Sequence, residues 1–349
     1  MSKITRTHEP SEFFEYVRLD GDRAIPPASP ECVDVAVLDM NHSWPNLGHD
    51  ALVHAVRDAA ELNRDSLNDA GLKVRVLSYD VRRCLLLPEA PGERFQLYIG
   101  TGGPGHLDPR MNDGHSEASQ GIDESPEWEG PLFRLFDAIL SSESAALLAV
   151  CHSFGLLCRW SGAAHAVLRG ADKNGKSSGM PLNVLTAEAC EHPWFGQLAR
   201  QLPDGAHHRV VDNRLFDLVV DPDVGGPFEP IAFELSADGT APGDAVTMIE
   251  FARDASDTMP RVFGVNHHPE IIDREHITAV LEQKRANREV SSAWYRERRD
   301  TMQELFLGEN ERQSRLTSYY TLLGPLQFHL TKLVDARRAE VAPAKRRAG

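Results

Sequence analysis

One short stretch constrains the fold of this chain more than any other. It runs from Ala145 to Gly155 and reads AALLAVCHSFG. An apolar run typical of a buried strand stops at Cys151, and a run compatible with a helix follows. A strand that turns directly into a helix needs small residues two positions before and after the turn, because bulky ones would clash. Ala149 and Ser153 occupy those positions, so we expect an elbow that exposes the Cys151 thiol.

A second apolar run ends in a histidine far downstream, in the segment VFGVNHHPE of residues 262–270. His268 is the candidate general base, because an imidazole titrates near the pH at which enzymes work. Glu270, two residues on, would orient the ring. Side chains alternate along a strand, so only one of His267 and His268 can face the cysteine. A cysteine, a base and a carboxylate are the parts of an activated thiol nucleophile.

A glycine-rich turn, TGGPG, follows the strand that we expect at residues 96–99. Glycines there let backbone N–H groups approach a substrate without a Cβ in the way. The N–H groups of Gly103 and His152 are therefore candidate donors to a tetrahedral oxyanion. An ordinary Gly-Pro turn is the alternative, and the spacing is not that of a phosphate-binding loop.

Strands alternate with helices along the first half of the chain, which predicts a mostly parallel α/β sheet with helices on both faces. Cys151 and His268 each follow an apolar run, so both belong at the carboxyl edge of the sheet, where such folds bind ligands. Short strands between residues 181 and 251 predict added antiparallel hairpins. The polar segment 105–130 predicts a long loop that is either a lid or disordered. The strands are expected at 33–40, 72–79, 96–99 and 145–150, and helices at 49–70 and 132–140.

The chain is expected to divide into four parts. Residues 1–30 are polar and rich in proline near their end, which predicts a leader or arm outside the core. Residues 31–274 form the α/β domain. Residues 275–338 carry apolar residues near helical spacing and form a helical appendage. Residues 339–349 form a basic tail that we expect to be disordered.

Composition excludes several classes of protein. The 349 residues carry a formal net charge of −15, which argues against nucleic acid as a partner. The apolar runs are far shorter than the roughly 20 residues of a membrane-spanning helix, and the N-terminal residues lack a signal core. Five cysteines without a CxxC pair favour free thiols in a reducing cytoplasm. The histidines and cysteines lack metal-binding spacing, so we expect no metal and no cofactor.

Together the three motifs resemble the class I glutamine amidotransferase family, whose pattern is a GGPG turn, an elbow cysteine and a final HPE. The resemblance covers approximately residues 33–272 and implies a flavodoxin-like fold. It implies that Cys151 attacks the side-chain amide of glutamine to form a γ-glutamyl thioester, with His268 as base and acid and Glu270 as its orienting carboxylate. It assigns the oxyanion donors to Gly103 and His152. In the family, the released ammonia passes to a synthetase domain or subunit.

The chain departs from the family pattern at the elbow. Ala149 and Ser153 stand where the family usually has glycines. Gly155 stands where it commonly has a glutamine that shapes the substrate pocket, and His267 where it often has an aromatic residue. We expect Gly102, Ser153 and Gly155 to shape the pocket of this chain.

Two alternatives to glutamine cleavage stay open. The same triad could serve a hydrolase or acyl transferase for another γ-glutamyl, amide or ester substrate, or the chain could be a non-catalytic scaffold. Because no synthetase domain is recognisable in the sequence, an ammonia acceptor would be a partner protein. The C-terminal helices would dock that partner or form a homo-oligomer.

Overall fold

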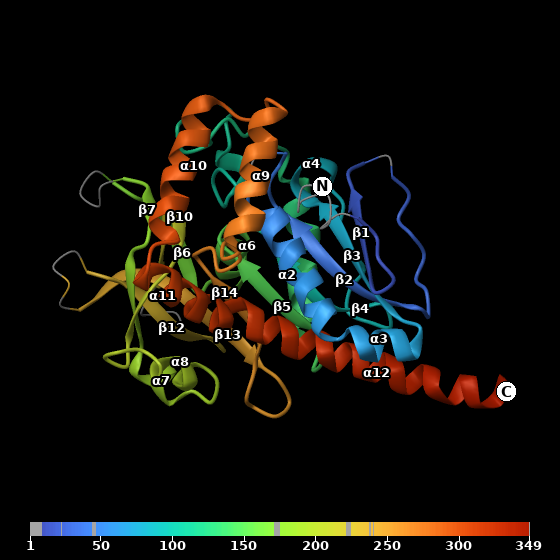
Figure 1. Ribbon diagram of the computed structural model, residues 1–349. Helices are drawn as coiled ribbons and strands as arrows, with labels where there is room; N and C mark the ends of the chain where they lie inside the picture. The colour runs from blue at the N-terminus through green and yellow to red at the C-terminus, as the bar shows by residue number, and fades with distance from the viewer. Residues whose placement is uncertain are drawn as a thin grey trace.

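The computed structural model describes residues 9–21, 23–43, 47–170, 175–220, 225–236, 239 and 241–348, with side chains up to residue 341. At its centre is a twelve-stranded sheet in the order β1-β3-β2-β4-β5-β14-β13-β12-β8-β9, with β11 and β6 branching from β13 (Figure 1). The strands from β1 to β14 in this order pair in parallel, and the remaining pairs are antiparallel. The expected hairpins therefore extend the same sheet.

The parallel strands are β1 (Phe14–Leu19), β2 (Cys32–Asp39), β3 (Lys73–Asp80), β4 (Phe95–Gly100), β5 (Ala146–Val150) and β14 (Pro260–Val265). The others are β6 (Ala164–Leu168), β8 (Leu182–Leu185), β9 (His207–Arg209), β11 (Phe216–Val220), β12 (Glu229–Leu235) and β13 (Pro242–Arg253). A separate antiparallel pair consists of β7 (Ser177–Gly179) and β10 (Asp212–Arg214).

Helices cover both faces of the sheet because the strand residues are apolar on both sides. In β2, Val33, Val35 and Val37 pack in one cluster, and Ala36 and Leu38 pack in another. The first cluster includes α2 (Gly48–Leu62), α3 (Arg64–Ala70), α7 (Ala187–Glu191), α8 (Phe195–Ala199) and α12 (Gly324–Ala348), and the second includes α5 (Glu129–Ser141) and α6 (His152–Ser161). The remaining helices are α4 (Val81–Cys84), α9 (Arg274–Ala286), α10 (Ser292–Leu305), α11 (Glu309–Ser318) and a π-helical turn, η4 (Tyr319–Leu323).

The expectation that residues 1–30 lie outside the core is wrong. The segment Phe14–Leu19 forms β1, which pairs in parallel with β3 along its whole length. Phe14 and Leu19 are fully buried, and Val17 is nearly so. Apolar residues at irregular spacing in a six-residue strand at the edge of the sheet give little period-two signal, which is why the sequence pattern missed it.

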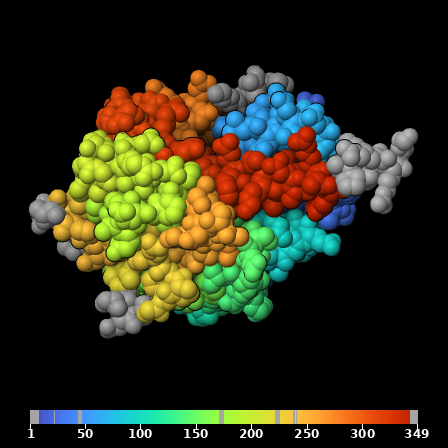
Figure 2. Space-filling view, turned by 90° about the horizontal axis from the view of Figure 1, so that it is seen from below, coloured from blue at the N-terminus to red at the C-terminus, as the bar shows by residue number. Residues whose placement is uncertain are grey.

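The C-terminal helices pack closely on the sheet. Figure 2 shows α12 (red) lying across one face, between the α2–α3 region (blue) and the turn that joins β13 to β14 (orange). Leu326, Leu330 and Val334 are fully buried in the first cluster, and His329 Nε2 lies 2.7 Å from the Pro260 carbonyl oxygen. The backbone stays helical to Ala348, so the prediction of disorder over residues 339–349 is wrong up to that residue.

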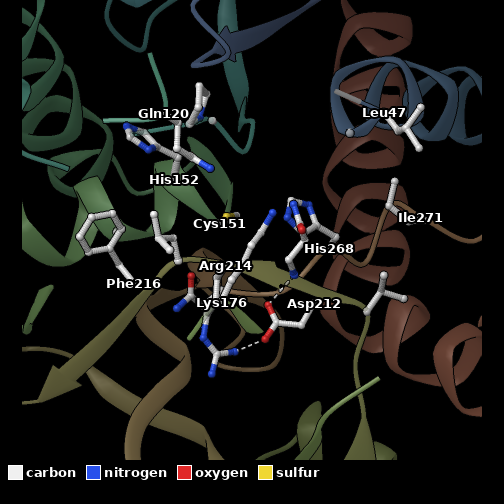
Figure 3. Close-up of a pocket in the computed structure, with 18 of the residues that line it drawn as sticks. Leu47, Gln120, Cys151, His152, Lys176, Asp212, Arg214, Phe216, His268 and Ile271 are labelled. Carbon is white, nitrogen blue, oxygen red and sulfur yellow. Dashed lines mark hydrogen bonds and ion pairs between the residues drawn. The ribbon is translucent and has the colours of Figure 1, made fainter. Parts of the chain in front are cut away.

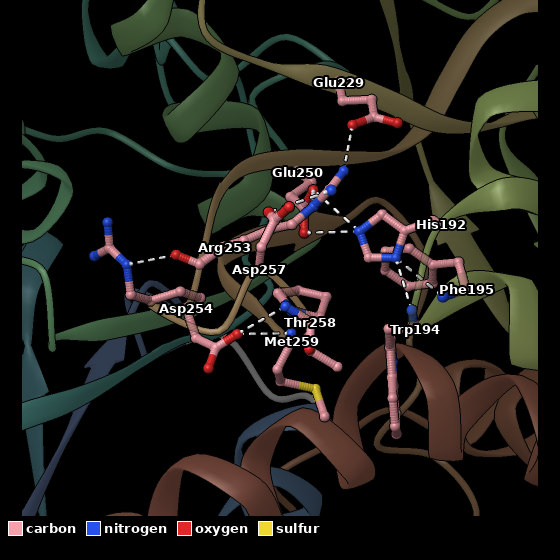
Figure 4. Close-up of polar contacts among 12 residues, drawn as sticks. His192, Trp194, Phe195, Glu229, Glu250, Arg253, Asp254, Asp257, Thr258 and Met259 are labelled. Carbon is pink, nitrogen blue, oxygen red and sulfur yellow. Dashed lines mark hydrogen bonds and ion pairs between the residues drawn. The ribbon is translucent and has the colours of Figure 1, made fainter.

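A buried polar network ties the short helices α7 and α8 to the sheet (Figure 4). His192 Nδ1 accepts the N–H groups of Trp194 and Phe195 at 2.9 and 3.2 Å, so Nε2 carries the proton and donates to Glu250 at 3.2 Å. Arg253 donates to Glu250 in turn at 2.7 Å. These groups satisfy one another and lie outside the cavity described below, so their role is structural. Among the described residues, no helix is long and apolar enough to cross a membrane.

Candidate active site

Cys151 lies at the sharp turn between β5 and α6. Its backbone has φ +50° and ψ −103°, a conformation that costs free energy for any residue except glycine and that clusters at functional sites. The Cys151 N–H donates to the Val265 carbonyl at 2.7 Å, and its own carbonyl accepts the Gly155 N–H at 2.9 Å, which starts the helix. The thiol therefore stands at the carboxyl edge of the sheet and at the N-terminus of α6.

Glycines on the neighbouring strands make room for this elbow. Ala149 pairs with Gly100 of β4 on one side and with Gly264 of β14 on the other. A Cβ on Gly100 would lie 2.5 Å from Ser153 Cβ, and a Cβ on Gly264 would lie 2.2 Å from Phe154 Cδ2. Glycines on the two strands that flank β5 therefore provide the space that the elbow needs.

Ser153 does not shape the pocket as expected. Its side chain is buried, and its hydroxyl donates to the Thr101 carbonyl at 2.6 Å. The Ser153 N–H donates to the same carbonyl at 3.3 Å. Ser153 therefore fastens the first turn of α6 to the start of the glycine-rich turn, outside the cavity.

Of the other two expected pocket residues, Gly102 lies beside the catalytic candidates and Gly155 lines the cavity. Gly102 does not line the cavity, but a Cβ on it would lie 3.0 Å from His268 Cε1 and 3.5 Å from Cys151 Cβ. The missing side chain therefore lets the ring and the cysteine approach the turn. Gly155 does line the cavity, and Leu107 fills the space beside it, 2.5 Å from where a Cβ would be.

His268 lies against Cys151. The His268 N–H donates to the Val211 carbonyl at 2.8 Å, which fixes the backbone just beyond β14. Ring Nδ1 lies 2.8 Å from Oε1 of Glu270, whose side chain is fully buried. Burial lowers the pKa of His268, but the charges of Glu270 and Cys151 and hydrogen bonds to both outweigh it, so the pKa lies well above its ordinary value. The structure thus brings the three predicted catalytic side chains together.

His267 points away from the thiol, as strand alternation predicts. Its ring is buried, and Nε2 lies 3.3 Å from the hydroxyl of Thr321 in the π-helical turn. Burial lowers the pKa of His267 well below its ordinary value, and the charges of His208 and His268 lower it further. His267 therefore joins the C-terminal helices to the sheet.

Gly103 and His152, the predicted oxyanion donors, both line the cavity that contains Cys151. His152 is the first residue of α6, so its N–H has no partner within the helix. A Cβ on Gly103 would lie 2.3 Å from the Met40 carbonyl oxygen, so only glycine fits there. The same Met40 carbonyl and that of Pro104 accept from Arg82 Nη1 at 2.9 and 2.7 Å.

Arg82 is a positioning residue for this turn. Its guanidinium is fully buried and pairs at 2.6 Å with Glu124, which is also fully buried. Glu124 belongs to the segment 105–130, which is compact and contains two 3₁₀ turns, η1 (Pro109–Met111) and η2 (Pro126–Trp128). Three residues of the segment, Gly105, Leu107 and Gln120, line the cavity.

The cavity in front of Cys151 has a volume of about 330 Å³ (Figure 3). The β10 region supplies one wall, in which Asp212 accepts from Ser177 at 2.6 Å and forms a buried ion pair with Arg214. Helix α10 supplies another. Its side chains on the cavity are Trp294, Glu297, Arg298, Thr301 and Met302. The sequence predicts that the C-terminal helices dock a partner, and one of them, α10, also forms part of the cavity wall.

Several residues of the site are not predicted from the sequence. In α10, Trp294, Glu297, Arg298 and Thr301 repeat at intervals of three and four, which marks one helix face but not what that face covers. Lys176 has no distinguishing signal in the sequence. Within the described residues, no three histidine, cysteine or acidic side chains cluster so as to hold a metal ion.

No protein-family model and no curated protein matches the chain. Among solved structures, SMU.1228c is 15% identical with a TM-score of 0.43, covering 87% of this chain and 98% of that one. A protein from Thermoplasma acidophilum, provisionally assigned as one of the subunits of a GMP synthase, is 11% identical with a TM-score of 0.36, covering 73% and 98%. A protein provisionally assigned as ThuA-like from Bacteroides uniformis is 10% identical with a TM-score of 0.37, covering 75% and 93%. The functional proposal rests on the geometry of the site.

Proposed function

We propose that this chain is a cysteine-dependent amidohydrolase of the glutamine amidotransferase type. The observation that carries the proposal is the strained Cys151 elbow at a helix N-terminus, with His268 against it and Glu270 2.8 Å from the far ring nitrogen. A scaffold has no use for a strained cysteine paired with an oriented imidazole.

In the first half of the reaction, the Cys151 thiolate attacks the side-chain amide carbon of glutamine. The carbonyl oxygen becomes an oxyanion, which the N–H groups of Gly103 and His152 would stabilise. The His268 imidazolium gives its proton to the departing nitrogen, so ammonia leaves and a γ-glutamyl thioester remains.

In the second half, a water molecule replaces ammonia. Neutral His268 takes a proton from the water, which attacks the thioester carbon. The C–S bond then breaks, and glutamate leaves while the thiolate and imidazolium form again. Glu270 stabilises the positive ring throughout because its carboxylate accepts from Nδ1.

A second candidate is cleavage of another γ-glutamyl, amide or ester substrate by the same triad. Two features of the cavity wall support this second candidate. Gly155 stands at the family's glutamine position, and Phe216 and Trp294 give the cavity aromatic surface. Comparing the rates for glutamine, γ-glutamyl amides and simple esters separates the two candidates.

The direct test measures glutamate and ammonia released from L-glutamine. We expect turnover by the native chain and a loss of at least about 1,000-fold in Cys151→Ala, because the nucleophile is gone. Cys190→Ser is the matched control, since Cys190 is a half-buried thiol outside the cavity. Equal activity in Cys151→Ala, or no cleavage of any of these substrates by the native chain, would reject the proposal.

A further inference from the structure

Two basic side chains line the cavity, and no carboxylate of the described residues forms a buried ion pair with either of them. Lys176 comes from the segment just before β7, and Arg298 comes from α10. Figure 3 shows Lys176 reaching into the space in front of Cys151 and His268. Among the described residues, no acidic side chain lies within ion-pair distance of Lys176, although Glu297 and Asp212 are near enough to influence its charge.

The nearby acidic groups are engaged elsewhere or face solvent. Asp212 is buried in its ion pair with Arg214 and its hydrogen bond from Ser177. Glu297 lies 3.6 Å from Arg298, but its side chain is 55% exposed, so water weakens this contact. The cavity therefore has an excess of positive charge on one side.

Arg298 is held in place by contacts other than its solvent-weakened ion pair with Glu297. Nη1 donates to Asn213 Oδ1 at 2.8 Å, and the guanidinium lies over the Trp294 ring, 5.5 Å from its centroid. These two contacts fix the plane of the guanidinium, as is needed for paired hydrogen bonds to an anion. Burial, together with the charge of Arg298, lowers the pKa of Lys176, and burial lowers that of Arg298. A bound anion would favour the charged forms of both side chains and so raise both pKa values.

We propose that Lys176 and Arg298 form an anion-binding site that selects amide substrates with a carboxylate at the end remote from the scissile amide. The inference rests on the proposed function for the position of the amide, and it adds the substrate class. It also gives α10 a role: the helix supplies the substrate-binding side chains Arg298 and Trp294.

The test is calorimetric binding to the full-length Cys151→Ala protein, in which no reaction consumes the ligand. Glutaramate has an amide at one end and a carboxylate at the other, and glutaramide has amides at both. We expect glutaramate to bind at least about tenfold more tightly, because a charged hydrogen-bond partner changes affinity by roughly 10- to 100-fold. Lys176→Met and Arg298→Gln should each remove most of this preference.

Arg296→Gln is the matched control. Arg296 lies on the exposed face of α10, so its loss removes the same charge from the same helix without changing the cavity, and the preference should persist. Equal affinity for the two ligands, or a preference that survives both cavity variants, would overturn the anion site. Binding with this preference in a protein that cleaves no amide would instead reject the proposed function and leave the anion site standing.

Alkylation of the native chain separates substrate binding from an effect on the thiol itself. Iodoacetate and iodoacetamide differ in charge but not in reaction, and mass spectrometry reports each at Cys151. We expect Lys176→Met to slow iodoacetate about tenfold or more and iodoacetamide less than twofold. If both reagents slow equally, Lys176 acts on the thiolate and the inference is wrong.

Discussion

Gly100, on the strand that faces the elbow, gives the sharpest prediction about how this fold presents its thiol. A Cβ on Gly100 would lie 2.5 Å from both Cβ and Oγ of Ser153. Ser153 cannot turn away, because it is buried and its hydroxyl is held by the Thr101 carbonyl at 2.6 Å. Overpacking of this kind costs about 1–3 kcal/mol, so we expect Gly100→Ala to lower the free energy of unfolding by that amount.

A second substitution tests the cause. Ser153→Gly removes both clashing atoms, and alone it should cost about 1 kcal/mol for the lost hydrogen bond and about 1 kcal/mol for glycine in a helix. When Ser153→Gly is combined with Gly100→Ala, the new Cβ on residue 100 no longer meets the Ser153 side chain. The double variant should therefore be more stable than the sum of the single effects predicts, by about 1–3 kcal/mol.

Urea unfolding measures all three free energies, and the rate of Cys151 alkylation reports whether the elbow is displaced. Gly92→Ala is the control, because a Cβ there meets only the Ala90 carbonyl at an ordinary 3.8 Å. It should change stability by less than about 0.5 kcal/mol. Additive effects of Gly100→Ala and Ser153→Gly, or a Gly100→Ala variant as stable as the control, would refute the reasoning.

Three further predictions concern charge and burial. Arg82→Met should lower the free energy of unfolding by about 3–5 kcal/mol in urea, because it leaves a buried carboxylate without its partner; a loss below 1 kcal/mol would contradict this. Glu270→Gln should lower the pKa of His268 in a nuclear magnetic resonance titration, since the Glu270 charge is the main cause that raises it; an unchanged titration would show that the ring is not oriented by this carboxylate. Burial lowers the pKa of His276 to about 4, so the unfolded chain binds a proton that the folded chain does not, and stability should fall by about 3 kcal/mol as the pH drops from about 6.5 to about 4. His276→Leu should lose this part of the pH dependence, and an unaltered profile would contradict the assignment.

The sequence predicted which residues meet at the candidate active site because each part follows a strong local pattern. Cys151 and His268 each follow an apolar run, and such runs become parallel strands whose carboxyl ends meet at one edge of the sheet. The glycine-rich turn was identified for the same reason, since it follows β4. The contact between the cysteine and the histidine could be expected from topology alone.

The walls of the cavity could not be predicted in the same way. Lys176 and Asp212 lie on or next to three-residue strands, which are too short for a periodic signal. Arg298 is one of several charged residues on α10, so the sequence pattern does not say which of them faces the site. That Gly100 and Gly264 face the elbow follows only from the register of β4, β5 and β14. This register depends on tertiary pairing and cannot be read from the sequence.

The central claim is that the Cys151 thiol and the His268 ring act together on a γ-glutamyl group. Incubation with 6-diazo-5-oxo-L-norleucine, a glutamine mimic that alkylates thiols, followed by peptide mass spectrometry, tests it most directly. The account predicts one adduct, on Cys151, with the half-buried Cys84 and Cys190 unmodified and the adduct lost in His268→Ala. A native chain that gains no adduct at Cys151, or a His268→Ala variant that gains it at the same rate, would contradict the account.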